Sequence, residues 1–444
     1  MGSILEVSEE TYEDRISNLP NSLIAQILSY LPTKYAVATS VLSTRWKQLW
    51  TSITSLDFDD MLTSCPQNKS TDPSLQRSFT SFVGRVLLHH VSCVQRFRLK
   101  CSRSYKASLV NGWIADALLR NVRELDLSIW MGHSTKLPQD LFTCRTLVVL
   151  KLDTYYCDMN NVPTLVSLPS LRILHLKGIR FVDDDSINRF LFGCPVLEEL
   201  SMRRCVGGNV SVIKIVAPML TSLFMNDNLF GYISPPHGFE CKIVLNTPAL
   251  LYLTISSSET NGFYLVESLH HLIRADIFLY DTSGMVSIVT DGSAISKALT
   301  DLLEGISNVQ FLHLGFSMEV TCMCDFQLPK FPNMTCLELG EIFNVKWEFL
   351  LELLENSPRL ETLVFKEGIG DDNEVFTQLL QNPARNVPSC LLSHLKVIGI
   401  SNFRGEKEEW EIVDYFLQNA EVLETVNIDY GCGGSKWTIH ASRT

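Results

Sequence analysis

Few residue clusters in this sequence have the types and spacing that chemistry requires. Asp183-Asp184-Asp185 could offer carboxylates to a metal ion. Aspartates at the opening of a helix over residues 186–192 are a commoner use, because they complement the helix dipole. The pairs His89-His90 and His270-His271 lack a third ligand at a regular spacing, so we interpret them as surface or helix-end histidines. Gly431-Cys432-Gly433-Gly434 has no following helix to hold a phosphate and is interpreted as a flexible tail.

Motifs of the common catalytic sites are missing as well. The sequence contains no GxGxxG, P-loop, GxSxG or HExxH motif. Cys322-Met323-Cys324 is the one close cysteine pair, and its spacing suits neither a zinc knuckle nor a redox turn. We therefore predict no catalytic residue, no metal and no required cofactor. An enzyme remains an alternative that only a missed site could support.

Composition narrows the classes of partner and the compartment. The 444 residues are 46% hydrophobic and 19% charged, an ordinary globular balance, and the length suggests two or three domains or a repeat array. The net charge of −12 argues against broad binding of nucleic acid or anionic membranes. The acidic N-terminus argues against a secretory signal, and the 13 irregularly spaced cysteines suit free thiols in a reducing interior. We expect a location in the cytoplasm and/or the nucleus.

The elements that could present a binding surface begin with three short amphipathic helices before residue 52. Asn21 can cap the first, which Pro32 ends, and Thr33 can cap the second. Their apolar positions recur at helical spacing. These positions are Ile24, Ile27, Leu28 and Leu31 in the first helix, Ala36, Val37, Val41 and Leu42 in the second, and Trp46, Leu49 and Trp50 in the third.

These helices carry more apolar surface than a unit of their size can bury. A unit of about 40 residues rarely builds a core of its own. The surplus includes two tryptophans and Arg45, residue types that dominate protein–protein hot spots. Helix patterning alone leaves two alternatives open. The surplus either binds a partner protein or packs against the rest of this same chain.

Behind the helices the sequence repeats an apolar-x-x-apolar-x-apolar pattern. First residues are mostly 23 to 30 apart, in the range of leucine-rich repeats. The copies begin at Ile53, Val94, Val122, Leu147, Leu171, Leu197, Leu220, Leu250, Val309, Met334, Leu360, Leu395 and Leu423, with a weaker copy at Leu272. Each copy is a strand followed by a return segment that cannot bury its own leucines. Stacking buries them, so the pattern predicts a solenoid with a parallel sheet on its concave face.

The longer gaps from Leu272 to Val309 and from Leu360 to Leu395 each have room for a full helix, which we predict over residues 294–303 and 374–380. Within each strand, the residue before each of the last two apolar positions and the residue after them should face the concave side. A mixed, aromatic-spotted wall of this kind suits a protein partner, although a solvated face is the alternative for any single residue. The candidate target-binding residues are Arg96, Arg98, Lys151, His175, Arg203, Phe224 and Tyr252.

Residues 14–50 resemble a plant F-box. The resemblance runs through Asp14-Arg15-Ile16, Leu19-Pro20, residues 27–34 (Ile-Leu-Ser-Tyr-Leu-Pro-Thr-Lys), residues 36–43 (Ala-Val-Ala-Thr-Ser-Val-Leu-Ser) and Arg45-Trp46. Asn21 and Tyr30 depart from the residues common there. The resemblance implies docking on the Skp adaptor subunit of a cullin ubiquitin ligase. The residues that we expect to bind the adaptor are Leu19, Pro20, Ile27, Leu28, Leu31, Pro32, Trp46 and Leu49.

The last part of the chain resembles the FBD domain, which accompanies F-boxes and leucine-rich repeats in a large plant family. The matching residues are Pro388-Ser389-Cys390-Leu391, Leu395-Lys396, Phe403-Arg404-Gly405, residues 408–411 (Glu-Glu-Trp-Glu) and residues 415–420 with Leu423. Its amphipathic helix should turn Trp410, Val413, Phe416 and Leu417 inward.

The predicted fold is α/β: a three-helix F-box over residues 12–52, a leucine-rich-repeat solenoid (horseshoe) over 53–380 and an FBD cap over 385–430. The expected function is substrate recognition in a Skp/cullin/F-box ubiquitin ligase, with a target protein on the repeats. A repeat scaffold without any degradation output is the alternative.

Related plant receptors hold an inositol phosphate on a basic inner face. That ligand is a further possibility here, although the candidate cations are interrupted by Glu124, Asp126 and Glu199. The cations are Arg96, Arg98, Lys100, Lys151, Lys177 and Arg203.

Overall fold

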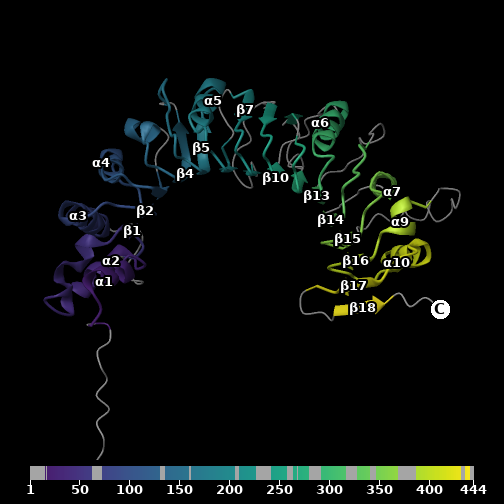
Figure 1. Cartoon of the computed structure of the whole chain (residues 1–444), viewed down its shortest axis with the longest axis horizontal. Coiled ribbons are helices and arrows are strands. Elements are labelled where there is room, and N and C mark those ends of the chain that lie inside the picture. The colour runs from purple at the N-terminus through teal and green to yellow at the C-terminus, as the bar shows by residue number, and fades with distance from the viewer. Residues whose placement is uncertain are drawn as a thin grey trace, which may run out of the picture. The chain divides into compact units, whose positions relative to one another are not determined.

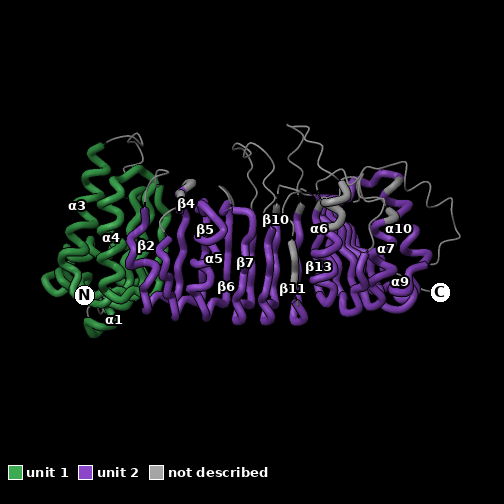
Figure 2. The backbone as a smooth tube through the Cα atoms, turned by 90° about the horizontal axis from the view of Figure 1, so that it is seen from above, with its two compact units in different colours: residues 1–131 green, residues 132–444 purple. Residues whose placement is uncertain are grey.

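A computed structural model describes residues 16, 18–62, 73–130, 136–159, 162–205, 210–226, 242–257, 264–267, 269–279, 292–316, 328–340, 347–368, 387–431 and 436–440. The chain divides into two compact units, Met1–Met131 (unit 1) and Gly132–Thr444 (unit 2) (Figure 2). Both units are built on parallel strands, and unit 1 also carries the N-terminal helices.

The N-terminal helices form around a small apolar core. The elements are α1 (Asn21–Leu28), α2 (Thr33–Ala38) and two short 3-10 helices, η1 (Thr39–Val41) and η2 (Trp46–Ser52). Ile24 and Leu28, one turn apart on α1, are 0% and 2% exposed, and they share the core with Trp46 and Leu49. The third predicted helix therefore exists, but as a 3-10 helix. Helix patterning places the elements correctly because their apolar spacing is regular.

Both predicted N-caps of these helices are wrong. Prolines occupy the cap positions, Pro20 before α1 and Pro32 before α2, and neither offers a side-chain cap. The side chain of Asn21 instead accepts a hydrogen bond from Arg45 Nε at 2.9 Å. Thr33, fully buried, accepts one from the backbone N–H of Asp57 at 2.7 Å. Thr33 thus joins α2 to the first strand, a tertiary contact that a local capping rule does not contain.

Three parallel strands with helices between them complete unit 1. In chain order the elements are β1 (Ser55–Asp59), α3 (Pro73–His89), β2 (Arg96–Cys101), α4 (Ala107–Leu119) and β3 (Glu124–Ile129). Alternate residues of each strand are buried under the helices, where Phe79 and Trp113 meet edge to face at 6.1 Å. The N-terminal helices and the first repeats therefore share one compact unit.

His90 lies directly after α3, at a helix end as the sequence suggests, but it is buried rather than at the surface. Its side chain is 3% exposed, and its Nε2 donates to the backbone oxygen of Ile53 at 2.8 Å. Its Nδ1 has no partner among the described residues. Burial lowers the pKa of His90 below its ordinary value of 6.5, and the nearby Arg120 adds to this, against the opposing effects of the Ile53 hydrogen bond and Asp116.

Acidification is expected to destabilise unit 1 through His90. Because its pKa is lower in the folded than in the unfolded chain, the unfolded chain takes up the proton first. The contribution of His90 to the free energy of unfolding is then fully present above about pH 6.5. It declines as the pH falls below that value. Thermal unfolding of the full chain across this range measures the decline. His90→Gln, which retains a donor but cannot titrate, should flatten it, and an unchanged slope in this variant would contradict the prediction.

Unit 2 is a longer parallel sheet with helices between some of its strands. The strands of the sheet are β4 (Val149–Met159), β5 (Ile173–Phe181), β6 (Glu199–Arg203), β8 (Ser222–Asn226), β10 (Tyr252–Ser257), β12 (Arg274–Leu279), β13 (Phe311–Phe316), β14 (Cys336–Gly340), β15 (Thr362–Phe365), β16 (Val397–Ile400), β17 (Thr425–Asp429) and β18 (Lys436–His440). The helices are η3 (Gln139–Thr143), α5 (Asp184–Phe192), α6 (Gly292–Gly305), α7 (Trp347–Glu355), α9 (Ser389–Ser393) and α10 (Lys407–Asn419). The described strands pair in this order, in parallel up to β17, and β18 closes the edge antiparallel to it.

The repeat pattern is confirmed as a stacked solenoid. In a typical copy, Leu147, Leu150 and Leu152 are at most 1% exposed, and the weaker copy at Leu272 forms β12 with Ala275 and Ile277 fully buried. The strands lie along one side of unit 2, and its helices lie along the other (Figure 1). Each repeat therefore buries its leucines against its neighbours, as the spacing predicts.

Three return segments are strands, which the sequence analysis did not anticipate. They are β7 (Val212–Val216), β9 (Lys242–Asn246) and β11 (Tyr264–Glu267), paired in parallel as a second sheet. Their alternation of apolar residues, clearest in β7 with Ile213 and Ile215 buried, is the signal that could have identified them. Successive extended return segments can satisfy their backbone groups by pairing with one another.

The predicted helices of unit 2 are mostly confirmed. The helix over 186–192 is α5 and that over 294–303 is α6, whereas 374–380 lies outside the described residues. On α10, Val413 and Phe416 are buried, but Trp410 is 43% and Leu417 38% exposed, so their predicted inward orientation is wrong. No helix in the described part of the chain is long and apolar enough to cross a membrane.

Candidate protein-docking surfaces

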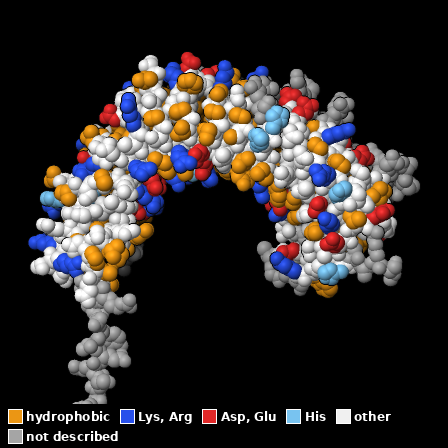
Figure 3. Space-filling model, viewed as in Figure 1, with side chains coloured by type: hydrophobic (Ala, Val, Ile, Leu, Met, Phe, Trp, Pro, Cys, Tyr) orange, Lys and Arg blue, Asp and Glu red, His pale blue; other side chains and the backbone are white. Residues whose placement is uncertain are grey.

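An exposed apolar surface covers the outer side of the N-terminal helices, opposite their core. Ile27 precedes the buried Leu28 on α1, so it points away from the core, and it is 49% exposed. Figure 3 shows hydrophobic side chains at the surface of this end of unit 1. We call the following residues the helical docking surface: Ile16, Leu23, Ile27, Tyr30, Leu31, Tyr35, Val41 and Leu42, all of them at least 37% exposed. So many large apolar side chains at the surface of so small a unit mark an interaction site.

The structure divides the predicted adaptor-binding residues into two groups. Pro20, Ile27 and Leu31 are exposed, and Leu19 and Pro32 are half-buried. Leu28, Trp46 and Leu49 are instead 2%, 8% and 8% exposed, packed inside the chain's own core. We therefore expect these three buried residues to hold the exposed residues in position rather than to contact the adaptor. That the other five residues, exposed or half-buried, contact the adaptor directly remains a prediction.

Arg45 fixes the shape of this surface. Its guanidinium donates to the side chain of Asn21 at 2.9 Å and, from Nη2, to the backbone oxygen of Leu19. Both acceptors lie at the start of α1, whereas Arg45 stands directly before η2. The arginine that looked like a partner-binding residue in the sequence thus ties the first helix to the last.

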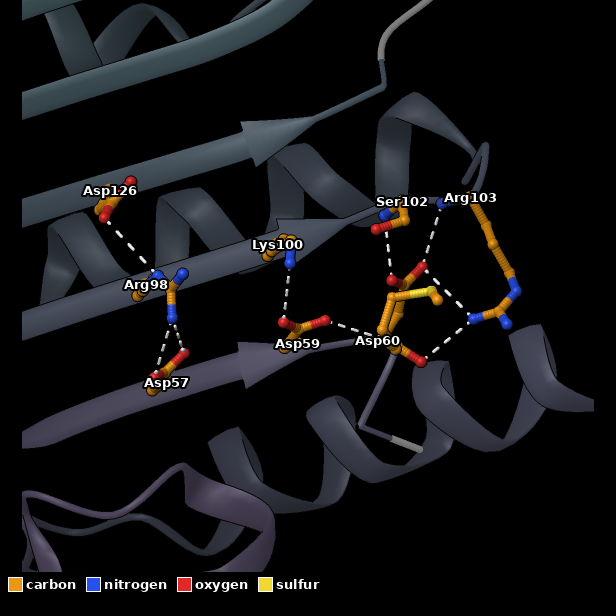
Figure 4. A network of polar contacts seen from close by, with 9 residues as sticks. Asp57, Asp59, Asp60, Arg98, Lys100, Ser102, Arg103 and Asp126 are labelled. Carbon is orange, nitrogen blue, oxygen red and sulfur yellow. Dashed lines mark hydrogen bonds and ion pairs between the residues drawn. The ribbon is translucent and has the colours of Figure 1, made fainter. Parts of the chain in front are cut away.

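The three candidate cations on β2, Arg96, Arg98 and Lys100, are neutralised within unit 1. Arg98 lies between Asp57 on β1 and Asp126 on β3, at 3.2 and 3.7 Å (Figure 4). Lys100 pairs with Asp59 at 3.1 Å. Arg96 pairs with Glu124 at 3.7 Å. These are cross-strand neighbours in the sheet register, so the charges satisfy one another on this face.

Asp60, which the sequence analysis missed, organises the loop after β2. It is fully buried directly after β1, and its carboxylate accepts the backbone N–H groups of Ser102 and Arg103, both at 3.0 Å (Figure 4). The Tyr105 hydroxyl donates to the same carboxylate at 3.1 Å, and Arg103 forms an ion pair with it at 3.6 Å. Burial and the Asp60 charge raise the pKa of Tyr105. We interpret Asp60 as structural, because its acceptor sites are used internally.

The strand face of unit 2 has a different arrangement near β4 to β8. Lys177 pairs with Asp153 at 2.9 Å, and His175 lies 2.6 Å from Glu199. Arg203 stacks over the ring of Phe224 at 4.5 Å. Lys151 and Tyr252 also lie on this face, Tyr252 48% exposed. The predicted target-binding residues in unit 2 are therefore on one face of one sheet, which the register brings together.

Further along the same face, from β12 to β15, the charges pair off again. Arg274 pairs with Asp276 at 2.8 Å and stacks over Phe311 at 3.9 Å. Lys366 pairs with Glu338 at 3.0 Å. Burial opposes ionisation of Asp276, but hydrogen bonds from His313 and Arg274 outweigh it and lower the pKa of Asp276. This part of the face is a closed network in which each of these charges already has a partner.

The inositol phosphate possibility remains an untested prediction. Of its six candidate cations, Arg96, Arg98, Lys100 and Lys177 each hold a carboxylate partner. A polyanion would have to displace these carboxylates before it could use the cations.

The aspartate cluster at 183–185 opens α5, as the helix-dipole interpretation predicts. Asp183 is the N-cap and accepts the backbone N–H of Ser186 at 2.7 Å. Asp184 accepts the backbone N–H groups of Ser211 and Val212 at 2.6 and 3.0 Å, and these hydrogen bonds lower its pKa despite its partial burial. Among the described residues no cluster of histidine, cysteine and carboxylate side chains could hold a metal ion.

The C-terminal part of unit 2 is organised by Glu409 on α10, which is 3% exposed. Its Oε2 accepts the backbone N–H groups of Arg404, Gly405 and Glu406 at 2.8, 2.7 and 3.2 Å. Gly405 has a φ of +81°, a conformation that favours glycine. Next to this loop, Phe403 meets Trp410 edge to face at 5.1 Å. The Phe-Arg-Gly and Glu-Trp motifs of the sequence are therefore parts of one structural contact.

Three family models match the chain. A model described as F-box domain matches residues 16–57. A model of the LRR repeats of FBD-associated F-box protein At5g56370 matches residues 110–258, and one described as FBD matches residues 381–428. The predicted domain bounds themselves remain predictions.

Relatives from Arabidopsis thaliana are similar over nearly the whole chain. F-box/LRR-repeat protein At3g59200 is 35% identical over 449 residues, covering 94% of this chain and 82% of the relative. F-box/FBD/LRR-repeat protein At4g26340 is 31% identical over 420 residues, covering 93% of this chain and 91% of the relative. The similarity therefore includes the helices, the repeats and the C-terminal part together.

Proposed function

This chain belongs to the plant F-box/FBD/LRR-repeat family, and from that premise we propose that it is the substrate-recognition subunit of a Skp/cullin/F-box ubiquitin ligase. In this proposal the helical docking surface binds a Skp-type adaptor, and the strand face of unit 2 holds a target protein. The observation that carries it is the F-box match over residues 16–57, on helices that expose Ile27 and Leu31. We place this activity in the cytoplasm or the nucleus.

The energetics of the helical docking surface suit a stable subunit contact. Fully burying an aliphatic side chain contributes about 1.5 to 3 kcal/mol, so a few of the eight exposed residues could supply micromolar affinity or better. The core formed by Leu28, Trp46 and Leu49 holds these side chains in place before binding. Such preorganisation reduces the entropy lost on association.

The chain itself makes or breaks no bond in the proposed reaction. Its contribution is proximity, because a tethered target meets the ligase's charged enzyme at a raised effective concentration. The choice of target then depends on the side chains of the strand face. The rate of ubiquitin transfer depends on the ligase complex to which the chain belongs.

Reconstitution tests the proposal. The full chain, co-expressed with a Skp-type adaptor, should elute with it as one complex, and addition of the cullin should allow ubiquitin transfer to a protein captured on the repeats. Proximity labelling in plant cells, with a docking-deficient variant as bait, can supply that captured protein. No complex with any Skp-type adaptor would contradict the proposal. A complex without ubiquitin transfer would favour the alternative of a non-degradative interaction scaffold.

A further inference from the structure

Two cations on the strand face of unit 2 have no carboxylate partner among the described residues. Lys151 lies on β4 and Arg203 on β6, and neither is in an ion pair with a described aspartate or glutamate. Arg203 is exposed and stacks over Phe224. The other strand-face cations of unit 2 discussed above, Lys177, Arg274 and Lys366, each contact a carboxylate within 3.0 Å. Because no described carboxylate neutralises them, Lys151 and Arg203 are open to an anion from a binding partner.

The charges around these two residues leave a local positive excess. Among the described side chains of this part of the face, the three cations Lys151, Lys177 and Arg203 face two carboxylates, Asp153 and Glu199, which leaves one positive charge with His175 counted as neutral. On β1 to β3 of unit 1, by contrast, the three cations Arg96, Arg98 and Lys100 face the four carboxylates Asp57, Asp59, Glu124 and Asp126. The whole chain has a net charge of −12, so a local excess of positive charge on a candidate binding face stands out from the rest of the chain.

The strand register places aromatic side chains beside this charge. Lys151 pairs in register with His175, His175 with Ser201, and Ser201 with Phe224. Arg203 is in register with Asn226, and Tyr252 lies on β10, the strand after β8. Neighbouring strands are about 4.8 Å apart, so Lys151 and Phe224 are separated by three strand spacings, or about 14 Å. A ligand that uses both must be extended rather than a single small anion.

We propose that the surface formed by Lys151, Arg203, Phe224 and Tyr252 binds an acidic segment of the target protein, one that carries carboxylates beside an aromatic or aliphatic side chain. This inference rests on the proposed function and names the chemistry of the target. The carboxylates form ion pairs with Lys151 and Arg203, which have no carboxylate partner in the described part of the chain. The apolar side chain packs on Tyr252 and on the ring of Phe224 already held by Arg203.

A protein segment fits this surface better than a nucleic acid does. Binding of a phosphate backbone draws on many cations along a groove, with several phosphate contacts in a typical site. Here the two cations that pair with no described carboxylate are bordered by Asp153 and Glu199, which would repel a continuous polyanion. Spaced carboxylates on a peptide can avoid these two side chains.

Fluorescence anisotropy with the purified full chain tests the inference. The probe is a fluorescein-labelled peptide of alternating Glu and Phe, compared with peptides in which Lys or Gln replaces every Glu. Only the Glu peptide should bind well, and Lys151→Glu combined with Arg203→Glu should weaken its binding by at least about tenfold. Lys151→Gln with Arg203→Gln should weaken it less, in the same direction.

A variant elsewhere on the chain controls for added negative charge, at half the charge change of the double variant. Lys330 is exposed on a segment outside the strands, so Lys330→Glu adds negative charge away from this face and should change the affinity by less than about twofold. Equal losses in Lys330→Glu, equal binding of the Lys peptide, or competition by single-stranded DNA at similar concentrations would each overturn the inference. Adaptor co-purification, measured on the same preparations, reports on the proposed function separately, because the variants lie outside the helical docking surface.

Discussion

Replacing Ile27 and Leu31 together by Asp is expected to abolish co-purification with a Skp-type adaptor while the chain stays folded. Both side chains are exposed, at 49% and 37%, so the free protein loses little by the change. In a complex the same positions would place two carboxylates in an apolar contact, where burying a polar group without a partner costs about 1 to 3 kcal/mol. Together with the lost apolar burial, we expect the affinity to fall by at least about a hundredfold.

Leu165→Asp combined with Val216→Asp provides the control for this variant. These residues are 68% and 51% exposed and lie in unit 2, so they impose the same chemical change outside the helical docking surface. Both double variants should have the circular dichroism spectrum of the wild type, and only the first should lose the adaptor in a pull-down. Retention of the adaptor by Ile27→Asp with Leu31→Asp would exclude this face of α1 from the contact.

The choice of positions shows what helix patterning could not decide. Ile24, Ile27, Leu28 and Leu31 form one spaced series in the sequence, yet the structure buries Ile24 and Leu28 and exposes the other two. A helix with apolar residues on two faces can pack either face against the core. The tertiary contacts decide which face is buried and which is exposed. Trp46 was expected at an interface because of its residue type. It is buried instead, because a small core needs large side chains to fill it.

The repeats were predictable because their signal is long-range and periodic. A single apolar triplet has many explanations, but copies at near-constant spacing have one physical solution, in which each buries the next. The return segments carry no such constraint, and β7, β9 and β11 were therefore missed. Their pairing depends on extended segments in three neighbouring repeats, which no single repeat reveals.

The charge pairs on the strand face were within reach of the sequence. Arg98 and Asp126 occupy equivalent positions in successive copies, and parallel stacking places equivalent positions side by side. The same register argument applies to Asp57 in the preceding copy. What the sequence could not supply is the buried role of Asp60, because a lone aspartate after a strand resembles any turn residue.

Glu409 raises the same difficulty at the other end of the chain. In the sequence it is one of several glutamates on an amphipathic helix, and position alone would place it at the surface. In the structure it is buried, and one carboxylate oxygen accepts three successive backbone N–H groups of the loop before α10. The other oxygen, Oε1, has no partner among the described residues. Without this carboxylate the three N–H groups would lose the acceptor that they share.

Glu409→Ala is accordingly expected to destabilise the C-terminal part of unit 2 by about 3 kcal/mol or more, since hydrogen bonds to a charged group contribute about 1.5 to 3 kcal/mol each and are not fully additive. Glu409→Gln retains one acceptor oxygen and should lose less. Hydrogen exchange over residues 403–430 measures the free energy of local opening directly, without assuming that the two units unfold together.

Glu411→Ala on the same helix removes only the surface pair with Lys407 at 3.1 Å, so its effect should stay within about 0.5 kcal/mol. Equal protection in Glu409→Ala and Glu411→Ala would mean that the loop is held by its aromatic contacts, Phe403 with Trp410 and Tyr430, rather than by the carboxylate.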